Sequence, residues 1–372
     1  MGDIYFNIDP EIIIGTDTIN RAGTICGRYG NKVLIVADKT LHENKETERL
    51  IAILKDSNIE AILFDEIPST SMADIVASTV SLAHAARCSS IIGFGDVTTQ
   101  AVARITALIA HAEIDIFDLL DGKSVQSGFL PYIAIPSTKE DLFLFSNICL
   151  SIDPRDRSVK QTRLPKGLCK AVIIDNDFIS NENIAYAFDG FCMSVEAYCS
   201  RKANFLSDPL LEQAIAFYSM IITGHDSKNE VIGEAGFLAS LGVALSTPGM
   251  GSVLSYLIAR RFPVAKSLCA AALLPGILEK LIATRPEKIA RVASLLGKPT
   301  EKLSIEESVS LVTSFIHSSL DAQNINPRLQ SLGLQLDPLI PLTEAARNLD
   351  FVGFSPWTVT SEELIGLIKQ SF

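Results

Sequence analysis

Apolar and polar residues alternate in two different ways along this chain, and the first half favours an α/β arrangement. Short apolar runs that end at turn residues are separated by longer segments with helical apolar spacing. The predicted strands are Lys32–Asp38, Ile59–Phe64, Ser89–Phe94 and Leu130–Pro136, and the predicted helices are Glu46–Ser57, Met72–Arg87 and Thr99–Ala112. Strands separated by helices predict a doubly wound parallel sheet, which binds ligands at the carboxyl ends of its strands.

From about residue 181 the pattern changes to helices alone. The predicted helices are Ala185–Ala203, Pro209–Thr223, Val231–Leu245, Gly251–Arg261, Ser267–Ala283, Pro286–Leu296, Ser304–Leu320, Leu342–Asn348 and Ser361–Gln370. Pro154 and the segment Leu164–Gly167 lie where the pattern changes from alternating strands and helices to helices alone. We therefore expect an α/β domain over residues 1–160 and an all-helical domain over residues 161–372.

Composition favours a compact cytoplasmic protein. Hydrophobic residues make up 48% of the 372 residues and charged residues 20%, which argues against disorder. No apolar run reaches the roughly 18 residues that a membrane span needs, and the amino terminus lacks the features of a signal peptide. The net charge of -11 argues against nucleic acid and anionic membranes as partners. Seven scattered cysteines and five scattered histidines favour buried thiols and argue against a histidine-rich metal site.

The turn after the third predicted strand is a candidate phosphate site. Gly95 would let a phosphate approach the backbone, and the helix that follows offers free amides and a partial positive charge. Asp96, however, puts a carboxylate into this turn. Its charge would repel a dinucleotide unless the side chain turns away, for instance to cap the helix. An ordinary turn between a strand and a helix has the same residues, so both interpretations stay open.

A second candidate site lies in the helical half, from Asp189 to Pro275. Asp189 and Met193 are four residues apart, on one face of a predicted helix. A later helix begins with the segment Gly249-Met-Gly-Ser-Val-Leu254, and the stretch closes with an apolar run that ends at Pro275. This layout resembles the metal-binding half of the iron-containing alcohol dehydrogenase family, within the dehydroquinate synthase-like fold. The family's motifs there are Asp-x-x-x-His, Gly-x-Gly-x-x-His and a third histidine before the apolar run.

The resemblance implies that Asp189 is the acidic metal ligand of the family. The positions of the three histidines hold Met193, Leu254 and Lys266, and Ile258 stands where a further histidine is frequent. Because leucine and a protonated lysine do not bind a divalent ion, and a thioether is a poor ligand for iron or zinc, we expect no family-type metal site. In one interpretation the ammonium of Lys266 replaces the ion and pairs with Asp189. In the other, the former pocket has become packed core.

The resemblance also implies contacts with a dinucleotide. The family's turn Gly-Gly-Gly-Ser-x-x-Asp-x-Ala-Lys corresponds to residues 95–104, and its next loop begins like residues 136–138. The positions matched to nucleotide contacts are Asp38, Gly95, Thr98, Ser137, Thr138 and Lys160. Among them, Lys160 falls near a family lysine that contacts the nicotinamide ribose. A carboxylate at Asp38 would accept hydrogen bonds from a free 2′-hydroxyl and repel a 2′-phosphate, which favours NAD over NADP.

Taken together, we expect a Rossmann-like α/β domain followed by an all-α domain. By resemblance, the function is NAD(P)-dependent oxidation of an alcohol or reduction of an aldehyde, without the usual metal and with altered or lost activity. Asp189 and Lys266 would form the altered catalytic centre. The alternative is a non-catalytic binding or scaffold subunit. Family members are commonly dimers, which implies a homodimer here.

Overall fold

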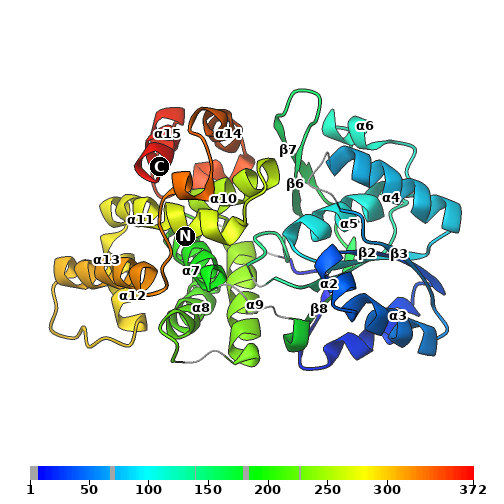
Figure 1. Cartoon of the computed structure of the whole chain (residues 1–372), viewed down its shortest axis with the longest axis horizontal. Helices are drawn as coiled ribbons and strands as arrows, with labels where there is room; N and C mark the ends of the chain where they lie inside the picture. Colours follow the sequence, from blue (N-terminus) through cyan, green and yellow to red (C-terminus); the bar gives the residue numbers. More distant parts are fainter. Residues whose placement is uncertain (1–6, 68–71, 139, 179–183, 226–227) are drawn as a thin grey trace. The chain divides into compact units, whose positions relative to one another are not determined.

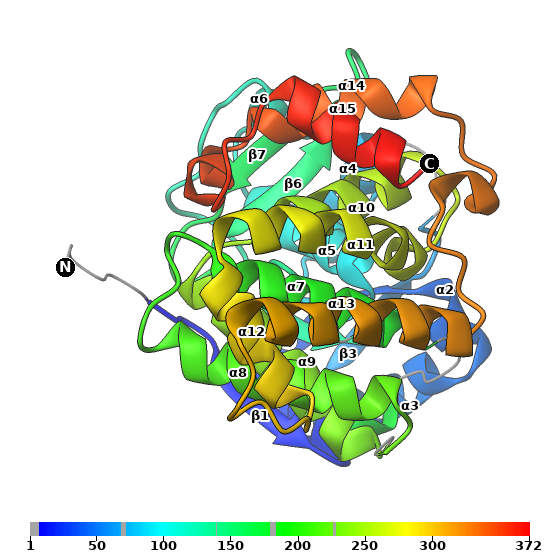
Figure 2. The same cartoon turned by 90° about the vertical axis from the view of Figure 1, so that its left-hand side faces the viewer.

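The computed structural model describes residues 7–67, 72–138, 140–178, 184–225 and 228–372, which fold into two compact units (Figures 1 and 2). The first unit comprises residues 1–180 and the second residues 181–372. The boundary expected near residue 160 falls instead inside strand β7 (Val159–Arg163). The sheet of the first unit continues beyond this point, because β8 (Cys169–Asp175) pairs with β1 near the start of the chain and with β5. Pro154 lies in the hairpin turn between β6 (Ile148–Ile152) and β7.

A parallel sheet forms the centre of the first unit. Its strands, in the order β1-β8-β5-β4-β2-β3, are β1 (Glu11–Gly15), β8, β5 (Tyr132–Pro136), β4 (Ser90–Gly95), β2 (Lys32–Ala37) and β3 (Glu60–Phe64). All neighbouring pairs run parallel. Runs of valine and isoleucine buried on both faces are typical of such strands. The predicted doubly wound α/β sheet is therefore confirmed.

Helices cover both faces of this sheet (Figure 1). On one face, α1 (Ala22–Cys26) and α3 (Glu46–Asp56) share a core cluster with the strands. On the other face, α5 (Val97–Ile109) packs against β4 and β5, and α4 (Met72–Ala86) packs against α5. Two short helices, α2 (Lys39–Glu43) and α6 (Ile116–Leu120), complete the unit. The carboxyl ends of β2, β4 and β5 lie at one edge of the sheet, where the nucleotide contacts were expected.

The second unit is helical, as predicted (Figure 2). Its α-helices are α7 (Ala185–Cys199), α8 (Ser207–Ile222), α9 (Asn229–Leu245), α10 (Met250–Arg261), α11 (Lys266–Thr284), α12 (Pro286–Leu295), α13 (Ile305–Ala322), α14 (Ile340–Arg347) and α15 (Ser361–Gln370). Each observed helix overlaps a predicted one, with ends that differ by a few residues. Apolar spacing therefore located these helices well, because it follows the buried face of each helix.

Helix α7 forms the core of this unit. All its residues except Tyr186 are buried, and it packs against α8, α9, α10, α11 and α12. A helix that is buried on every side is apolar all round, and its few polar residues are enclosed with it. Asp189, Ser194 and Glu196 of α7 are therefore buried polar groups that need partners inside the protein.

One helix of the described residues, α11, is long and apolar enough to cross a membrane, and the bent pair α9 and α10 passes the same test jointly. Within the test window of α11, 56% is buried inside the protein. Core helices of soluble proteins share this composition, so the finding is weak support for a membrane span.

Candidate functional site

Asp189 and Lys266 form a buried ion pair in the second unit. Asp189 lies in α7, and Lys266 is the first residue of α11. The Lys266 ammonium donates a hydrogen bond to Oδ2 of Asp189, and the two side chains are 11% and 0% exposed. Within the described part of the chain, Oδ1 of Asp189 is buried without a hydrogen-bond partner. The pairing that one of the two interpretations of the sequence proposed is present, and it leaves one buried carboxylate oxygen for a further donor.

The electrostatics of Asp189 are set chiefly by burial. Removal from water raises the pKa of this carboxyl above its ordinary value, and the nearby ammonium of Lys266 acts in the opposite direction. The carboxylate of Glu196, in the same helix, adds to the rise.

The other positions expected at this site are filled by apolar side chains. Met193, Leu254 and Ile258 are fully buried, on helices α7 and α10 that pack against each other and against α11. Among the described residues, no group of three or more His, Cys, Asp or Glu side chains could hold a metal ion. One carboxylate beside an ammonium does not fit a divalent cation, because it supplies too few ligands and the ammonium repels the ion.

Glu196 anchors helix α10 to α7. Its Oε1 accepts a hydrogen bond from the Gly251 amide at 2.7 Å, and its Oε2 accepts from the Ser252 amide at 2.9 Å and the Ser252 hydroxyl at 2.7 Å. The first amides of a helix lack partners within the helix and carry partial positive charge, which suits a carboxylate. Burial nevertheless raises the pKa of Glu196, and these hydrogen bonds offset only part of the rise.

The two glycines of the Gly-x-Gly segment make room for this anchor. A Cβ on Gly249 would lie 2.3 Å from Cβ of Glu196, and a Cβ on Gly251 would lie 2.6 Å from Cγ1 of Ile277. Glu196 was not among the predicted site residues. Its signal in the sequence is its place seven residues after Asp189, which puts both carboxylates on one face of α7.

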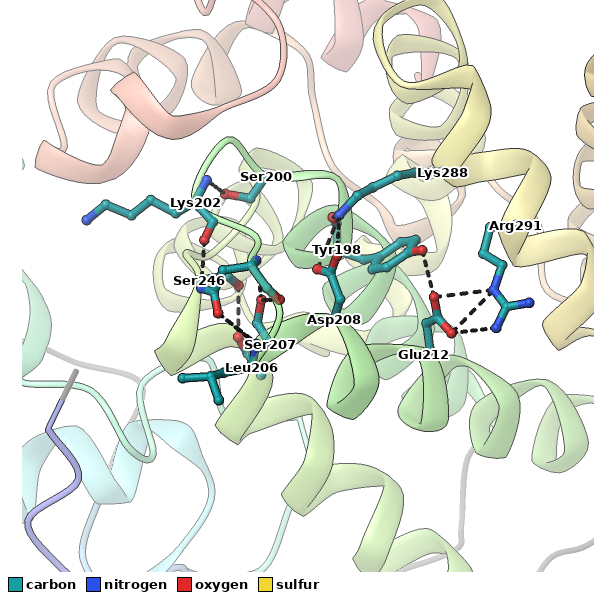
Figure 3. Close-up of polar contacts among 12 residues, drawn as sticks. Tyr198, Ser200, Lys202, Leu206, Ser207, Asp208, Glu212, Ser246, Lys288 and Arg291 are labelled. Carbon is teal, nitrogen blue, oxygen red and sulfur yellow. Dashed lines mark hydrogen bonds and ion pairs between the residues drawn. The ribbon is translucent and has the colours of Figure 1, made fainter. Parts of the chain in front are cut away.

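The carboxyl end of α7 is fixed by a polar cluster (Figure 3). Lys288 of α12 donates to the Tyr198 carbonyl at 2.6 Å and to Oδ2 of Asp208 at 3.0 Å. The Tyr198 hydroxyl donates to Glu212 at 2.8 Å, and Glu212 also accepts from Arg291 at 2.8 Å. A cation at the end of a helix satisfies a carbonyl that has no partner within the helix. These contacts join α7, α8 and α12, and so hold the helix that carries Asp189.

In the first unit, Asp38, Gly95 and Ser137 come together at the edge of the sheet. The amide of Asp38 donates to the Phe94 carbonyl at 3.0 Å, and the amide of Ser137 donates to the Gly95 carbonyl at 3.0 Å. A Cβ on Gly95, whose φ is +157°, would lie 2.9 Å from Cβ of Asp38. Asp38 also caps α2, because its side chain accepts from the Thr40 amide at 2.8 Å.

Gln100 stabilises this edge, although it was not predicted to. Its side-chain amide is fully buried and donates to the carbonyls of Gly93, Gly95 and Ile135 at 3.0 to 3.1 Å. It thereby joins the carboxyl ends of β4 and β5. No signal in the sequence points to this role, because neither the burial of Gln100 nor its partners on β4 and β5 can be seen in it.

The remaining predicted nucleotide contacts differ in position. Thr98 is partly buried in the first turn of α5, and Thr138 follows Ser137 directly, with its hydroxyl buried and without a partner in the described residues. Lys160 lies in β7, outside the six-stranded sheet, with its ammonium 4.0 Å from Asp156. Five of the six candidates therefore lie around Gly95, and the sixth, Lys160, lies in the hairpin.

Known sequences that resemble this chain cover almost its whole length. The family described as "Iron-containing alcohol dehydrogenase" matches residues 9–176, and "Fe-containing alcohol dehydrogenase family, C-terminal" matches residues 183–372. The chain is 22% identical over 355 residues to the choline dehydrogenase of Bacillus subtilis (strain 168), which covers 92% of this chain and 88% of that protein. It is 21% identical over 362 residues to the lactaldehyde reductase of Escherichia coli (strain K12), with coverage of 95% and 93%.

Solved structures share the fold. A 1,3-propanediol oxidoreductase superposes with a TM-score of 0.89 at 20% identity, over 100% of both chains. The sulfoacetaldehyde reductase from Bifidobacterium kashiwanohense, solved in complex with NAD+, superposes with a TM-score of 0.81 at 14% identity, over 100% of this chain and 99% of that chain. The matched sequence families and the α/β and helical units agree, and the chain belongs to the iron-containing alcohol dehydrogenase family.

Proposed function

We propose that this protein is an NAD-dependent oxidoreductase that reduces an aldehyde, or oxidises the corresponding alcohol, without a metal ion. The observation that carries the proposal is the buried pair of Lys266 and Asp189, at the positions where the family resemblance locates a metal ligand set. The ammonium supplies the positive charge that a carbonyl oxygen needs while it gains negative charge.

The chemistry follows from the two side chains. As hydride adds to the carbonyl carbon, the oxygen becomes an alkoxide and accepts a hydrogen bond and then a proton from Lys266. Asp189 holds Lys266 in place by accepting a hydrogen bond from its ammonium. Alcohol oxidation is the reverse, in which Lys266 receives the proton of the alcohol. A single ammonium stabilises an oxyanion less than a divalent ion does, so we expect slow turnover.

The proposed cofactor is NAD rather than NADP. Asp38 lies at the carboxyl end of β2, and its side chain caps α2, which leaves a carboxylate at the position where the resemblance puts the adenosine ribose. Its charge would repel a 2′-phosphate. The relative solved in complex with NAD+ supports a dinucleotide as the cofactor class. The seven free cysteines support a reducing, cytoplasmic location.

The test is NADH-dependent reduction of a panel of small aldehydes in the presence of EDTA, together with metal analysis of the purified protein. We expect activity that EDTA does not change, and a loss of about 100-fold or more in kcat for Lys266→Met, the loss typical of one oxyanion donor. Lys280→Met is the matched control, because Lys280 lies in the same helix but pairs with Glu363 at the surface. A tightly held stoichiometric divalent ion would contradict the proposal.

A second candidate function is a non-catalytic binding or scaffold subunit. The complete burial of Met193, Leu254 and Ile258 favours it, because ordinary core side chains stand at the positions that the resemblance gives to histidine ligands. The same experiments distinguish the two functions. A scaffold binds no aldehyde and shows no turnover with any nucleotide, whereas the proposed oxidoreductase binds NAD and turns over slowly.

A further inference from the structure

The amino terminus of α5 is occupied by a carboxylate of the chain itself. Asp96 is the N-cap residue of this helix of 13 residues, and its Oδ1 accepts a hydrogen bond from the Thr99 amide at 2.8 Å. Capping therefore does not turn the charge away from the candidate phosphate turn. It holds the carboxylate against the Thr99 amide, which is one of the backbone amides that a phosphate would use.

The backbone at Gly95 is covered in a similar way. A Cβ on Gly95 would meet Oγ1 of Thr99 at 2.8 Å and Cβ of Asp38 at 2.9 Å. The glycine is thus required by the close approach of two side chains of this chain, as well as by its positive φ of +157°. On this side of the turn, Thr99 and Asp38 take the space that a phosphate oxygen would need to reach the Gly95 backbone.

We infer that Asp96 is an affinity-determining residue, whose carboxylate weakens the binding of the phosphate groups of NAD at the proposed site without preventing it. A phosphate that uses the Thr99 amide must displace the Asp96 carboxylate, and a phosphate that uses a neighbouring amide is repelled by it. A nucleoside, which has no phosphate, meets neither obstacle. The inference rests on one part of the proposed function, which is that the turn at Gly95 is the dinucleotide site.

The discriminating experiment is calorimetric titration with adenosine, AMP, ADP-ribose and NAD. The variants are Asp96→Asn and Asp96→Ser, because asparagine and serine cap helices as well as aspartate does while they carry no charge. Asp115→Asn is the matched control, because Asp115 caps α6 in the same unit through its own bond to the Asp118 amide at 2.8 Å. Circular dichroism melting of each variant shows that the fold is kept.

We expect both Asp96 variants to bind ADP-ribose and NAD at least tenfold more tightly than the wild type does. The gain should be of similar size for AMP, because a phosphate monoester at pH 7 carries about −1.5 to −2 charges, nearly as many as a pyrophosphate. The affinity for adenosine should stay within about twofold, because the effect is electrostatic and adenosine carries no phosphate. Asp115→Asn should bind every ligand as the wild type does.

The outcomes separate this inference from the proposed function. Binding of NAD by the wild type, with no gain in the Asp96 variants, overturns the inference and leaves the proposed function standing. Binding by the variants but not by the wild type would mean that Asp96 prevents binding, which overturns the inference that it only weakens binding and contradicts a functioning NAD enzyme. Failure of all three proteins to bind any nucleotide overturns both, and an equal gain for adenosine and NAD overturns the electrostatic explanation.

Discussion

Glu196 and Ser252, which lie on different helices, are joined by two hydrogen bonds to one carboxylate oxygen. Oε2 of Glu196 lies 2.9 Å from the amide nitrogen and 2.7 Å from the hydroxyl of Ser252. Because Ser252 lies in the first turn of α10, the bond fixes where α10 begins relative to α7. The side chain of Leu254, two residues further on, is thereby held in the core beside the helix of Asp189.

The first prediction concerns this anchor. Glu196→Gln keeps one acceptor oxygen but turns an NH2 group toward an amide or hydroxyl donor, so at least one hydrogen bond is replaced by a clash of donors. We expect the free energy of unfolding to fall by about 2 kcal/mol, the range for hydrogen bonds to a charged group. Urea denaturation measures it. Glu306→Gln, at an exposed position of α13, should change stability by less than about 0.5 kcal/mol.

The second prediction compares two helical glycines. Gly251→Ala puts a methyl group 2.6 Å from Cγ1 of Ile277 and 3.2 Å from Oε1 of Glu196, so the core must shift and stability should fall by about 1 to 3 kcal/mol. Gly366→Ala, in α15, meets nothing within 4 Å and should raise stability by about 0.5 to 1 kcal/mol through helix propensity. Thermal melts of both variants provide the test, and a stabilised Gly251→Ala would contradict the described packing.

Much of the fold was predictable because its signals are local. The runs Val33–Ala37 and Ile133–Ile135 are apolar at every position, as strands buried on both faces must be, and each lies in the observed sheet. The domain boundary was not predictable in the same way. Pro154 does interrupt regular structure, but it does so in the turn of a β-hairpin and not between two domains. Only the long-range pairing of β8 with β1 shows that the sheet continues past it.

The candidate site was predictable where a motif fixed the spacing. The position of Lys266, counted back from Pro275, led to the pairing with Asp189 that the structure contains. Glu196 and Gln100 were missed for a common reason. Each is a buried polar side chain whose partners lie on a different element, and the sequence shows neither the burial nor the partners.

The third prediction concerns pH. Burial raises the pKa of Glu196 above its ordinary value of 4.5, so between that value and the folded-state pKa the folded protein binds more protons than the unfolded chain. The stability that Glu196 contributes is then present below pH 4.5 and is lost as pH rises through the folded pKa. The wild type should therefore lose stability relative to Glu196→Gln as pH rises from 4.5, by at most about 1.4 kcal/mol per pH unit.

The measurement is urea denaturation of the wild type and Glu196→Gln at a series of pH values, with Glu306→Gln as the control whose difference from the wild type should not vary. A difference that grows in favour of the wild type as pH rises would show the opposite sign. It would mean that the amides of α10 lower the pKa of Glu196 by more than burial raises it.

The fourth prediction separates the stability of the buried pair from its chemistry. Lys266→Met leaves the Asp189 carboxylate buried without its cation, which should lower the free energy of unfolding by about 3 to 5 kcal/mol. The double variant Asp189→Asn with Lys266→Met removes both charges and should recover most of that stability. Its turnover should nevertheless stay as low as that of the single variant, because the donor to the carbonyl is absent. Recovery of activity in the double variant would contradict the role of Lys266 as the donor to the carbonyl oxygen.

The fifth prediction restores a ligand set. The triple variant Met193→His, Leu254→His and Lys266→His adds three imidazoles to Asp189 at the positions that the family motif gives to histidine. If this chain differs from metal-binding members of the family in its ligands but not in its helix packing, the variant should bind one equivalent of Zn2+. The wild type should bind none. Bound metal stabilises the fold by RT ln(1 + [L]/Kd), about 2.7 kcal/mol at 100 times Kd, which thermal melts with and without zinc detect. Addition of Asp189→Asn to the triple variant should weaken zinc binding about tenfold or more. If the quadruple variant bound zinc as tightly as the triple variant does, the zinc would be held elsewhere.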